Sequence, residues 1–394
     1  MTLRDQSIAA SSAGRRTGSS LVLSTGFGLT GAGTVMLGVL LPALSQKWGM
    51  RDDAAGFLLF LQFLGSSLGA LAVGARRVRS LISGYGLLAV SACALAFAGM
   101  HLSFAIFLFF GLGLGMAMTA TSLLFSDRYP NDRAARLERL NFAWAAGASA
   151  GPVLFLPFLR LQSLDPLFFF LVALFLLFFL WAVFRENETP PPAQSAPDAL
   201  LEQRPVPLFT LLPLLLMAIG SVGIEASLSG WLTTYSHRAD SQGTGGAVFA
   251  PSLFWFGIVV SRLAFSTRLM AIVGRHRLLR VILWGVAASL ALLVAAQHPA
   301  PIRVAAVLAG LFIGPLYPLV LSFLLKRSSR GWIFAVAGIG SALLPWLTGV
   351  FSAHFGSLRY GLIAPGGAAV LLVLLSFIDL RTADSSLQDD AARA

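Results

Sequence analysis

Charged side chains are scarce along the whole sequence. Only 11% of its 394 residues are charged and 57% are hydrophobic, whereas a soluble domain of this size carries about a quarter charged residues. Because the shortage extends over the entire chain, it excludes a water-soluble protein and predicts a polytopic membrane protein. The first 19 residues are polar and small and lack an apolar stretch of signal-peptide type. We therefore expect the first span to act as an uncleaved insertion signal.

Residues that could carry bond-making chemistry are also few. Cys93 is the single cysteine and lies in an apolar segment, which excludes an intramolecular disulfide. All five histidines fall at the ends of apolar segments or in loops, which argues against an intramembrane metal site or a histidine proton relay. No paired carboxylates and no serine–histidine–acid arrangement occur at membrane depth. We therefore expect neither an enzyme nor a bound cofactor or metal.

Long apolar segments make up most of the chain. Each is close to or above the ~20 residues that a membrane helix needs, and helices are expected because backbone groups in lipid must be satisfied within the segment. The predicted fold class is therefore an all-α membrane protein with twelve spans, at 20–45, 54–74, 81–99, 101–125, 139–160, 166–184, 207–235, 249–270, 279–296, 302–325, 331–353 and 359–380.

The basic residues predict the orientation of the spans. With both termini in the cytoplasm, 21 of the 28 lysines and arginines fall in inner segments and 6 in outer segments, which is a firm positive-inside bias. The net charge of +11 is thus explained by topology and by contact with anionic inner-leaflet lipid. We expect a multi-pass protein of the inner (plasma) membrane, in contact with the lipid bilayer and not with nucleic acid.

A polar segment divides the spans into two groups of six. It runs from Arg185 to Pro207 and is rich in proline and alanine, which is typical of a flexible linker. Six plus six spans with both termini inside is the layout of major facilitator transporters, whose halves are parallel repeats around a midplane site. The predicted parts are a disordered tail over 1–19, a six-helix half over 20–184, a cytoplasmic linker over 185–206, a second half over 207–380 and a disordered tail over 381–394.

Two charged residues lie deep inside predicted spans, Glu225 in the seventh and Arg262 in the eighth. A lone charge at the bilayer centre costs at least ~2.5–3.5 kcal/mol, so such residues face a partner or a water-filled cavity. Ser221, Ser229 and Thr233 repeat every four residues around Glu225, and this polar stripe should face the interior. Two interpretations remain open: a structural ion pair, or a site that binds solute or a coupling ion.

Aromatic and amide side chains on other spans complete a possible substrate site. A cavity lined by indoles, a carboxylate, an amide and hydroxyls suits a small polyol, because aromatic faces pack on the C–H patches of a sugar. For each tryptophan the alternative is an interface anchor or a packing residue. The candidate substrate-binding residues are Gln62, Asn141, Trp144, Glu225, Trp231, Tyr235, Trp255, Tyr317 and Trp346.

Five short motifs resemble the fucose-proton symporter-like (FHS) family of major facilitator sugar transporters. The resemblance covers most of the chain and implies the major facilitator fold and a sugar substrate. The motifs are Gly223, Glu225, Gly230–Trp231 and Thr234–Tyr235 in the seventh span, Leu140–Asn141, Trp144, Gly147–Ala148 and Gly151–Pro152 in the fifth, Phe254–Trp255 and Ser261–Arg262 in the eighth, Gly314–Tyr317 and Pro318 in the tenth, and Leu344–Trp346 and Gly349 in the eleventh.

The sequence departs from this family where the family carries acids. Fucose-type members have a first-span aspartate four residues before a proline, and here Gly38 precedes Pro42 at that spacing. The family's fourth-span glutamate has no counterpart between Thr119 and Ser122, and the loop GARRVRS after the second span has no acid. Three alternatives follow: Glu225 couples a proton, a sodium ion couples, or transport is facilitative.

The sequence thus predicts a monomeric transporter of a small polar solute, either secondary-active, by symport, or facilitative. A monosaccharide importer for a hexose such as glucose, working by alternating access, is the first hypothesis. Efflux of an amphipathic drug or metabolite is the alternative. A non-transporting membrane sensor is a distant third, because the polar segments are too short for a signalling domain.

Overall fold

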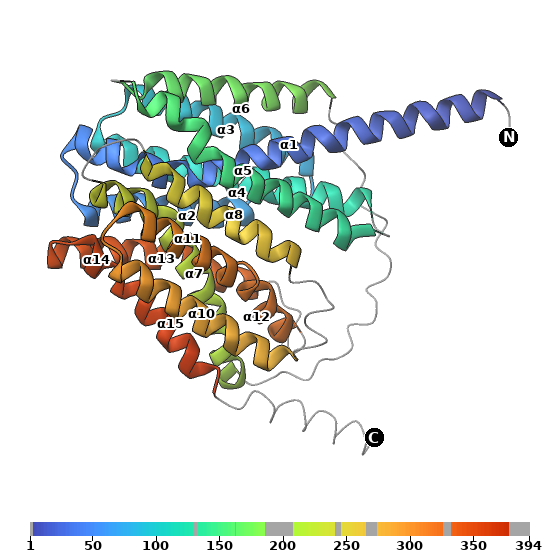
Figure 1. The fold of residues 1–394 in the computed structure, drawn as a ribbon. Helices are drawn as coiled ribbons and strands as arrows, with labels where there is room; N and C mark the ends of the chain where they lie inside the picture. The colour runs from blue at the N-terminus through green and yellow to red at the C-terminus, as the bar shows by residue number, and fades with distance from the viewer. Residues whose placement is uncertain are drawn as a thin grey trace, which may run out of the picture.

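The computed structural model describes residues 3–129, 132–161, 163–185, 208–240, 246–264, 274–325 and 332–377. Within these residues the chain forms helices joined by short connections (Figure 1). The first half contains α1 (Leu3–Trp48), α2 (Asp52–Leu71), α3 (Arg77–Phe97), α4 (Met100–Arg128), α5 (Arg133–Leu159) and α6 (Asp165–Arg185). The second half contains α7 (Leu208–Ala239), the short 3-10 helix η2 (Gly246–Val248), α8 (Phe249–Ala264), α10 (Arg275–Ala295), α11 (Pro299–Ile313), α12 (Leu316–Leu325), α13 (Trp332–Phe355), α14 (Leu358–Gly361) and α15 (Ile363–Leu375).

The twelve predicted spans are confirmed. Twelve helical segments of the described chain are long and apolar enough to cross a membrane, and each overlaps one predicted span. The predicted fifth span starts at 139, whereas α5 begins at Arg133. The difference arises because the prediction left out the charged first turns of this helix. The ends that the sequence predicts for the eighth and twelfth spans, up to 270 and 380, reach outside the described residues.

Two spans are each built from two helices. The tenth consists of α11 and α12, which are separated at Gly314 and Pro315. Proline has no N–H to donate and its ring clashes with the preceding turn, which kinks or breaks a helix; the helix is interrupted at Gly314 and Pro315, whereas α1 and α13 continue through Pro42 and Pro345. The twelfth consists of the single turn α14 followed by α15.

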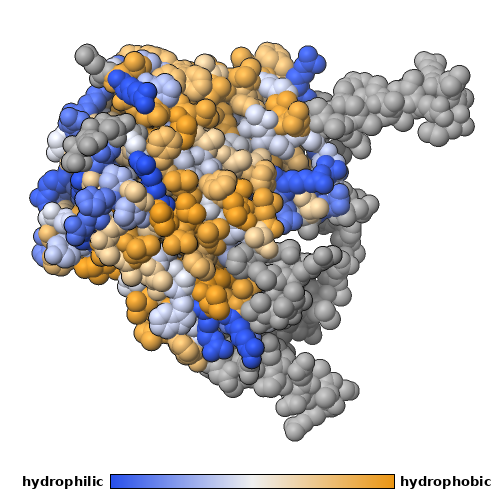
Figure 2. All heavy atoms as spheres, viewed as in Figure 1, coloured by the Kyte–Doolittle hydropathy of each residue, from blue (hydrophilic) through white to orange (hydrophobic). Residues whose placement is uncertain are grey.

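The exterior of the bundle is apolar around its middle. Figure 2 shows hydrophobic side chains across the centre of the visible face, with hydrophilic ones gathered toward its two ends. Large exposed apolar residues include Leu71, Phe97 and Phe184, each more than 70% exposed. Exposure of this much apolar surface is expected for helices that face lipid.

The helices pack as two halves (Figure 1). In the first half α2 and α3 pack on α4 and α1 packs on α5, and in the second half α7 packs on α13 and α8 on α11. The largest contacts between the halves in the described residues are α1 with α7, α2 with α13, and α5 with α8. The predicted tail over 381–394 and nearly all of the predicted linker lie outside the described residues, while α1 is already helical from Leu3, where the sequence predicts a disordered tail.

Contacts between the halves run from one end of the bundle, where α2 begins, along α2 as far as Ser67, which lies next to Gly338 of α13. We call the end at which α2 begins the far end; it lies opposite the end from which α1 projects beyond the bundle in Figure 1. Near the far end, the start of α2 meets the last turns of α7 and α13 through Asp52, which binds Arg238 and Ser352. The second half of α1 meets α7 through Gly38, next to Ser229 and Gly230.

Candidate functional site

The two deep charges lie opposite one another on neighbouring helices. Glu225 on α7 and Arg262 on α8 are 14 and 13 residues from the far ends of their helices, which is about 20 Å at 1.5 Å per residue. The two side chains interact electrostatically, and Glu225 has a second electrostatic interaction with Tyr317 of α12. The structure therefore brings three predicted residues of the second half together near mid-membrane.

Glu225 and Arg262 do not form a closed ion pair. Within the described part of the chain, no ion pair within 4.0 Å and no side-chain hydrogen bond joins them. Both residues are partly exposed, yet the Nε atom of Arg262 is buried and has no hydrogen-bond partner. A buried donor left unpaired costs about 1–3 kcal/mol, so an added acceptor at this atom would be stabilising.

The polar stripe on α7 faces the protein interior, as its four-residue spacing predicts. Ser221, Ser229 and Thr233 are all buried. Ser229 Oγ accepts a hydrogen bond of 3.2 Å from Nε1 of Trp255 on α8. The stripe therefore places Glu225 and Trp255 on the same side of the second half.

Two indole rings join the halves beside this stripe. Trp144 of α5 and Trp255 of α8 lie edge to face, with ring centroids 5.0 Å apart. Ser149 Oγ donates to the Ser252 carbonyl, 3.1 Å away, and so adds a second contact between α5 and α8. The Nε1 atom of Trp144 is buried without a partner, so this N–H is available to a ligand acceptor.

The first half contributes two amides. Gln62 of α2 is 1% exposed, and its Nε2 donates to the Thr34 carbonyl of α1 at 2.8 Å. Its Oε1 is buried and unpaired, so Gln62 can still accept one hydrogen bond. Asn141 of α5 is exposed even though Ala145 and Ala148, one and two turns further along the same face, are buried. This change along one face is consistent with halves that separate away from the far end.

Three other predicted residues contact neighbouring helices. Trp231 is buried and its Nε1 donates to the Pro345 carbonyl at 2.9 Å, which ties α7 to α13. The Tyr235 hydroxyl donates to the Leu293 carbonyl at 2.8 Å near the far end. Trp346 packs on Phe60 of α2, with ring centroids 5.7 Å apart.

The geometry of α7 explains why two of these residues are separated from the carboxylate. Trp231 is six residues after Glu225 and therefore about 120° around the helix, and Tyr235 is ten residues and about 80° away. Trp231 thereby faces α13, and Tyr235 faces the last turn of α10.

An ion pair between the halves is the feature that the sequence analysis did not predict. Arg238 at the end of α7 donates to both Asp52 carboxylate oxygens, at 2.6 and 2.7 Å. Ser352 of α13 donates to the same carboxylate. The sequence does place Asp52 and Arg238 next to predicted outer loops, but 186 residues separate them and no local pattern pairs them. This cluster closes the far end of the interface.

Gly38 precedes Pro42 by four residues, and the structure gives a physical reason for glycine at this position. A Cβ atom at this position would lie 2.6 Å from the Ser229 carbonyl oxygen and 2.8 Å from the Gly230 Cα atom. No side chain fits there while α1 and α7 are in contact.

We therefore expect Gly38→Asp to prevent closure of the far end. Overpacking costs about 1–3 kcal/mol. This cost would shift the equilibrium between the closed and open arrangements by roughly 5- to 150-fold toward the open one. The measurement is maleimide labelling of a cysteine placed at Thr233, in a protein that lacks Cys93; labelling should become faster. Gly99→Asp is the control, because a Cβ at Gly99 meets nothing within 4 Å. Equal labelling rates in the two variants would contradict the interpretation.

Comparison with known proteins shows the family. The sequence matches the family model described as Major Facilitator Superfamily over residues 23–333, and no curated protein matches it. A bacterial homologue of the human lysosomal transporter Spinster, in an inward-facing and occupied conformation, is similar with a TM-score of 0.71 and 16% identity, over 93% of this chain and 97% of that chain. A mutant of the nucleoside transporter NupG is similar with a TM-score of 0.74 and 13% identity, over 91% of this chain and 98% of that chain.

At these identities the two structures support the fold alone, and none of the comparisons confirms the narrower resemblance to the fucose-proton symporter-like family. Because the family model covers most of the sequence, the chain belongs to the Major Facilitator Superfamily.

Proposed function

We propose that this major facilitator transporter carries a small polar solute, a hexose-sized monosaccharide such as glucose, by alternating access around Glu225 and Arg262. One observation carries the proposal. A carboxylate and a guanidinium from the second half face each other without an ion pair, and Trp144 from the first half has an unpaired N–H. Polar groups from both halves are thus left for a ligand to satisfy.

A sugar suits these groups because each hydroxyl can both donate and accept a hydrogen bond. Glu225 accepts, Arg262 and Trp144 donate, and the faces of the two indoles pack on the C–H patches of the ring. An aliphatic drug would leave the same buried groups unpaired, at about 1–3 kcal/mol for each group. The geometry therefore favours a polyol over the amphipathic efflux substrate of the alternative hypothesis.

Transport follows from rocking of the two halves. The Asp52–Arg238 pair and the Gly38 contact hold the far end closed. Release of these contacts, with closure of the opposite end, exposes the site to the other side of the membrane. Glu225 is the acid that we assign to coupling by a proton or a sodium ion; if uptake is independent of both gradients, transport is facilitative.

A nucleoside is the second candidate substrate. NupG, a nucleoside transporter by its name, has a similar fold, and the edge-to-face pair of Trp144 and Trp255 offers aromatic surface to a planar base. The ribose hydroxyls would then take the places proposed for the sugar hydroxyls at Glu225.

Uptake by proteoliposomes tests the proposal. The panel contains labelled hexoses, nucleosides and a lipophilic cation, each with and without imposed proton and sodium gradients. We expect saturable uptake of a hexose and none of the cation. Saturable uptake of nucleosides alone would select the second candidate, and transport of the cation without uptake of any polar solute would contradict both.

Replacing Trp144 by phenylalanine should weaken substrate binding and leave the fold intact. The change keeps an aromatic ring beside Trp255 but removes the unpaired N–H. Loss of one neutral hydrogen bond, about 0.5–1.5 kcal/mol, predicts a KM about 2- to 10-fold higher at an unchanged melting temperature. Trp231→Phe is the matched control, because its N–H bonds Pro345; it should lower the melting temperature and leave KM unchanged. The reverse pattern would contradict the assignment.

A further inference from the structure

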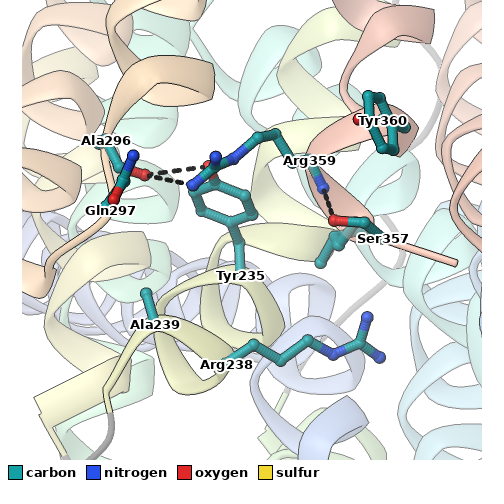
Figure 3. Close-up of a pocket in the computed structure, with 9 residues that line it drawn as sticks. Tyr235, Arg238, Ala239, Ala296, Gln297, Ser357, Arg359 and Tyr360 are labelled. Carbon is teal, nitrogen blue, oxygen red and sulfur yellow. Dashed lines mark hydrogen bonds between the residues drawn. The ribbon is translucent and has the colours of Figure 1, made fainter.

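A second, polar pocket opens at the far end of the second half. It has a volume of about 450 Å³ and lies between the end of α7, the connection from α10 to α11, and α14 (Figure 3). Its lining includes two arginines, Arg238 and Arg359, and the amide of Gln297. It is distinct from the proposed transport site, because Glu225 lies ten residues, nearly three helical turns, before Tyr235, the lining residue closest to it along α7.

The two arginines differ in how their donors are used. The Arg238 guanidinium is occupied by the Asp52 carboxylate through two short hydrogen bonds. The Arg359 guanidinium makes one long contact of 3.4 Å with the Ala296 carbonyl, which also accepts from the Tyr235 hydroxyl at 3.4 Å. A guanidinium has five N–H donors, so most of those on Arg359 are not used by the described residues.

Among the residues that the structure describes, no acidic side chain lines this pocket. All nine lining residues are neutral or basic, and Asp240, which follows Ala239 in the chain, is not among them. Figure 3 shows the Arg359 side chain extending across the pocket toward Ala296, with Gln297 beside its guanidinium and Arg238 on the opposite side of the Tyr235 ring. A positive pocket with unused guanidinium donors favours a ligand with oxygen acceptors and negative charge.

The surroundings place the pocket at the depth of lipid headgroups. Tyr360 lines the pocket and is 52% exposed, and its ring lies 5.9 Å from that of Phe355, which is 53% exposed. Exposed aromatic rings of this kind gather where a membrane protein meets the membrane–water interface. Phosphate groups of lipids lie at the same level.

We propose that this pocket binds a phosphate oxyanion, with Arg359 as its principal ligand and Gln297 beside it. The phosphodiester of an anionic lipid headgroup and a soluble phosphate share this chemistry. Arginine pairs with phosphate through two parallel hydrogen bonds, and the volume accommodates the headgroup of a single lipid.

Native mass spectrometry tests the proposal. The full-length protein is released from detergent in the presence of increasing concentrations of dioleoyl-phosphatidylglycerol. We expect one saturable site in the wild type. Arg359→Gln should weaken it by about tenfold or more, as for the loss of a charge-assisted hydrogen bond, and Arg359→Lys should weaken it less. Arg160→Gln is the control, because it removes an exposed arginine at the end of α5 and should leave the affinity unchanged.

A second variant and a second ligand keep the test decisive. If Arg359→Gln does not fold, Gln297→Glu adds a negative charge at the exposed rim of the pocket and should weaken lipid binding equally. In a separate thermal-shift experiment, inorganic phosphate is added without lipid and the melting temperature of the protein is measured. Stabilisation by phosphate that Arg359→Gln removes identifies a soluble oxyanion as the source, while binding of phosphatidylglycerol alone identifies the lipid. Equal binding of both ligands to the wild type and to every folded pocket variant would overturn the proposal.

Discussion

Glu225→Gln is expected to lower substrate uptake about 100-fold or more. The change removes an acceptor for substrate hydroxyls and leaves Arg262 without a nearby negative charge. Loss of a charge-assisted hydrogen bond costs about 1.5–3 kcal/mol, and an uncompensated intramembrane cation adds to this cost. Initial rates of hexose uptake by proteoliposomes, at matched protein incorporation, measure the effect.

Glu138→Gln is the matched control for this change. Glu138 lies on α5 and is exposed, so we expect its replacement to leave uptake within about twofold. If Glu225 also couples an ion, Glu225→Gln should abolish the gradient dependence of whatever uptake remains. Unchanged uptake with unchanged gradient dependence would remove Glu225 from the mechanism.

Asp52→Asn is expected to open the far end of the bundle and to reduce uptake about tenfold. The Asp52 carboxylate receives both hydrogen bonds from Arg238 and one from Ser352, and its side chain is 11% exposed. Exposed ion pairs contribute about 0–1 kcal/mol, whereas truncation of a buried, hydrogen-bonded charge pair costs about 2–5 kcal/mol. Because Arg238 is 44% exposed, the expected cost lies between these values, at about 1–2 kcal/mol. The measurement is the distance distribution between spin labels on α2 and α7 at the far end.

The neighbouring aspartate provides the control for this prediction. Asp53 makes an exposed ion pair with Arg51 within the first half, at 3.5 Å, and Asp53→Asn should leave both the distances and the uptake unchanged. Exchanging the charges, with Asp52→Arg and Arg238→Asp in one protein, should restore part of the closed population. Identical distance distributions for Asp52→Asn and the wild type would show that this pair does not hold the halves together.

The twelve spans could be predicted because membrane insertion depends on local composition. A window of about 20 apolar residues is visible in the sequence without knowledge of any neighbour, and all twelve segments were confirmed. Burial of Ser221, Ser229 and Thr233 agrees with the predicted stripe but does not single it out, because Ser227, Thr234 and Ser236 on the same helix are equally buried.

The composition of the site depended on contacts that sequence spacing does not encode. Trp231 and Tyr235 share the span of Glu225, but which neighbour each one faces depends on the packing of α13 and of the last turn of α10. Trp346 lies at the contact between α2 and α13, where Phe60 covers it. The Asp52–Arg238 pair joins opposite halves of the chain, so no pattern within either half could reveal it.

The most direct test of the central claim is equilibrium binding of a hexose to the site between the halves. Isothermal titration of the purified protein with the transported hexose would compare the wild type with Glu225→Gln and Trp144→Phe. Polar contacts from both halves predict saturable binding by the wild type, about 2- to 10-fold weaker binding by Trp144→Phe, and a loss of about 100-fold in Glu225→Gln. Hexose binding that is equally strong in all three proteins would contradict a sugar site at Glu225 and Trp144.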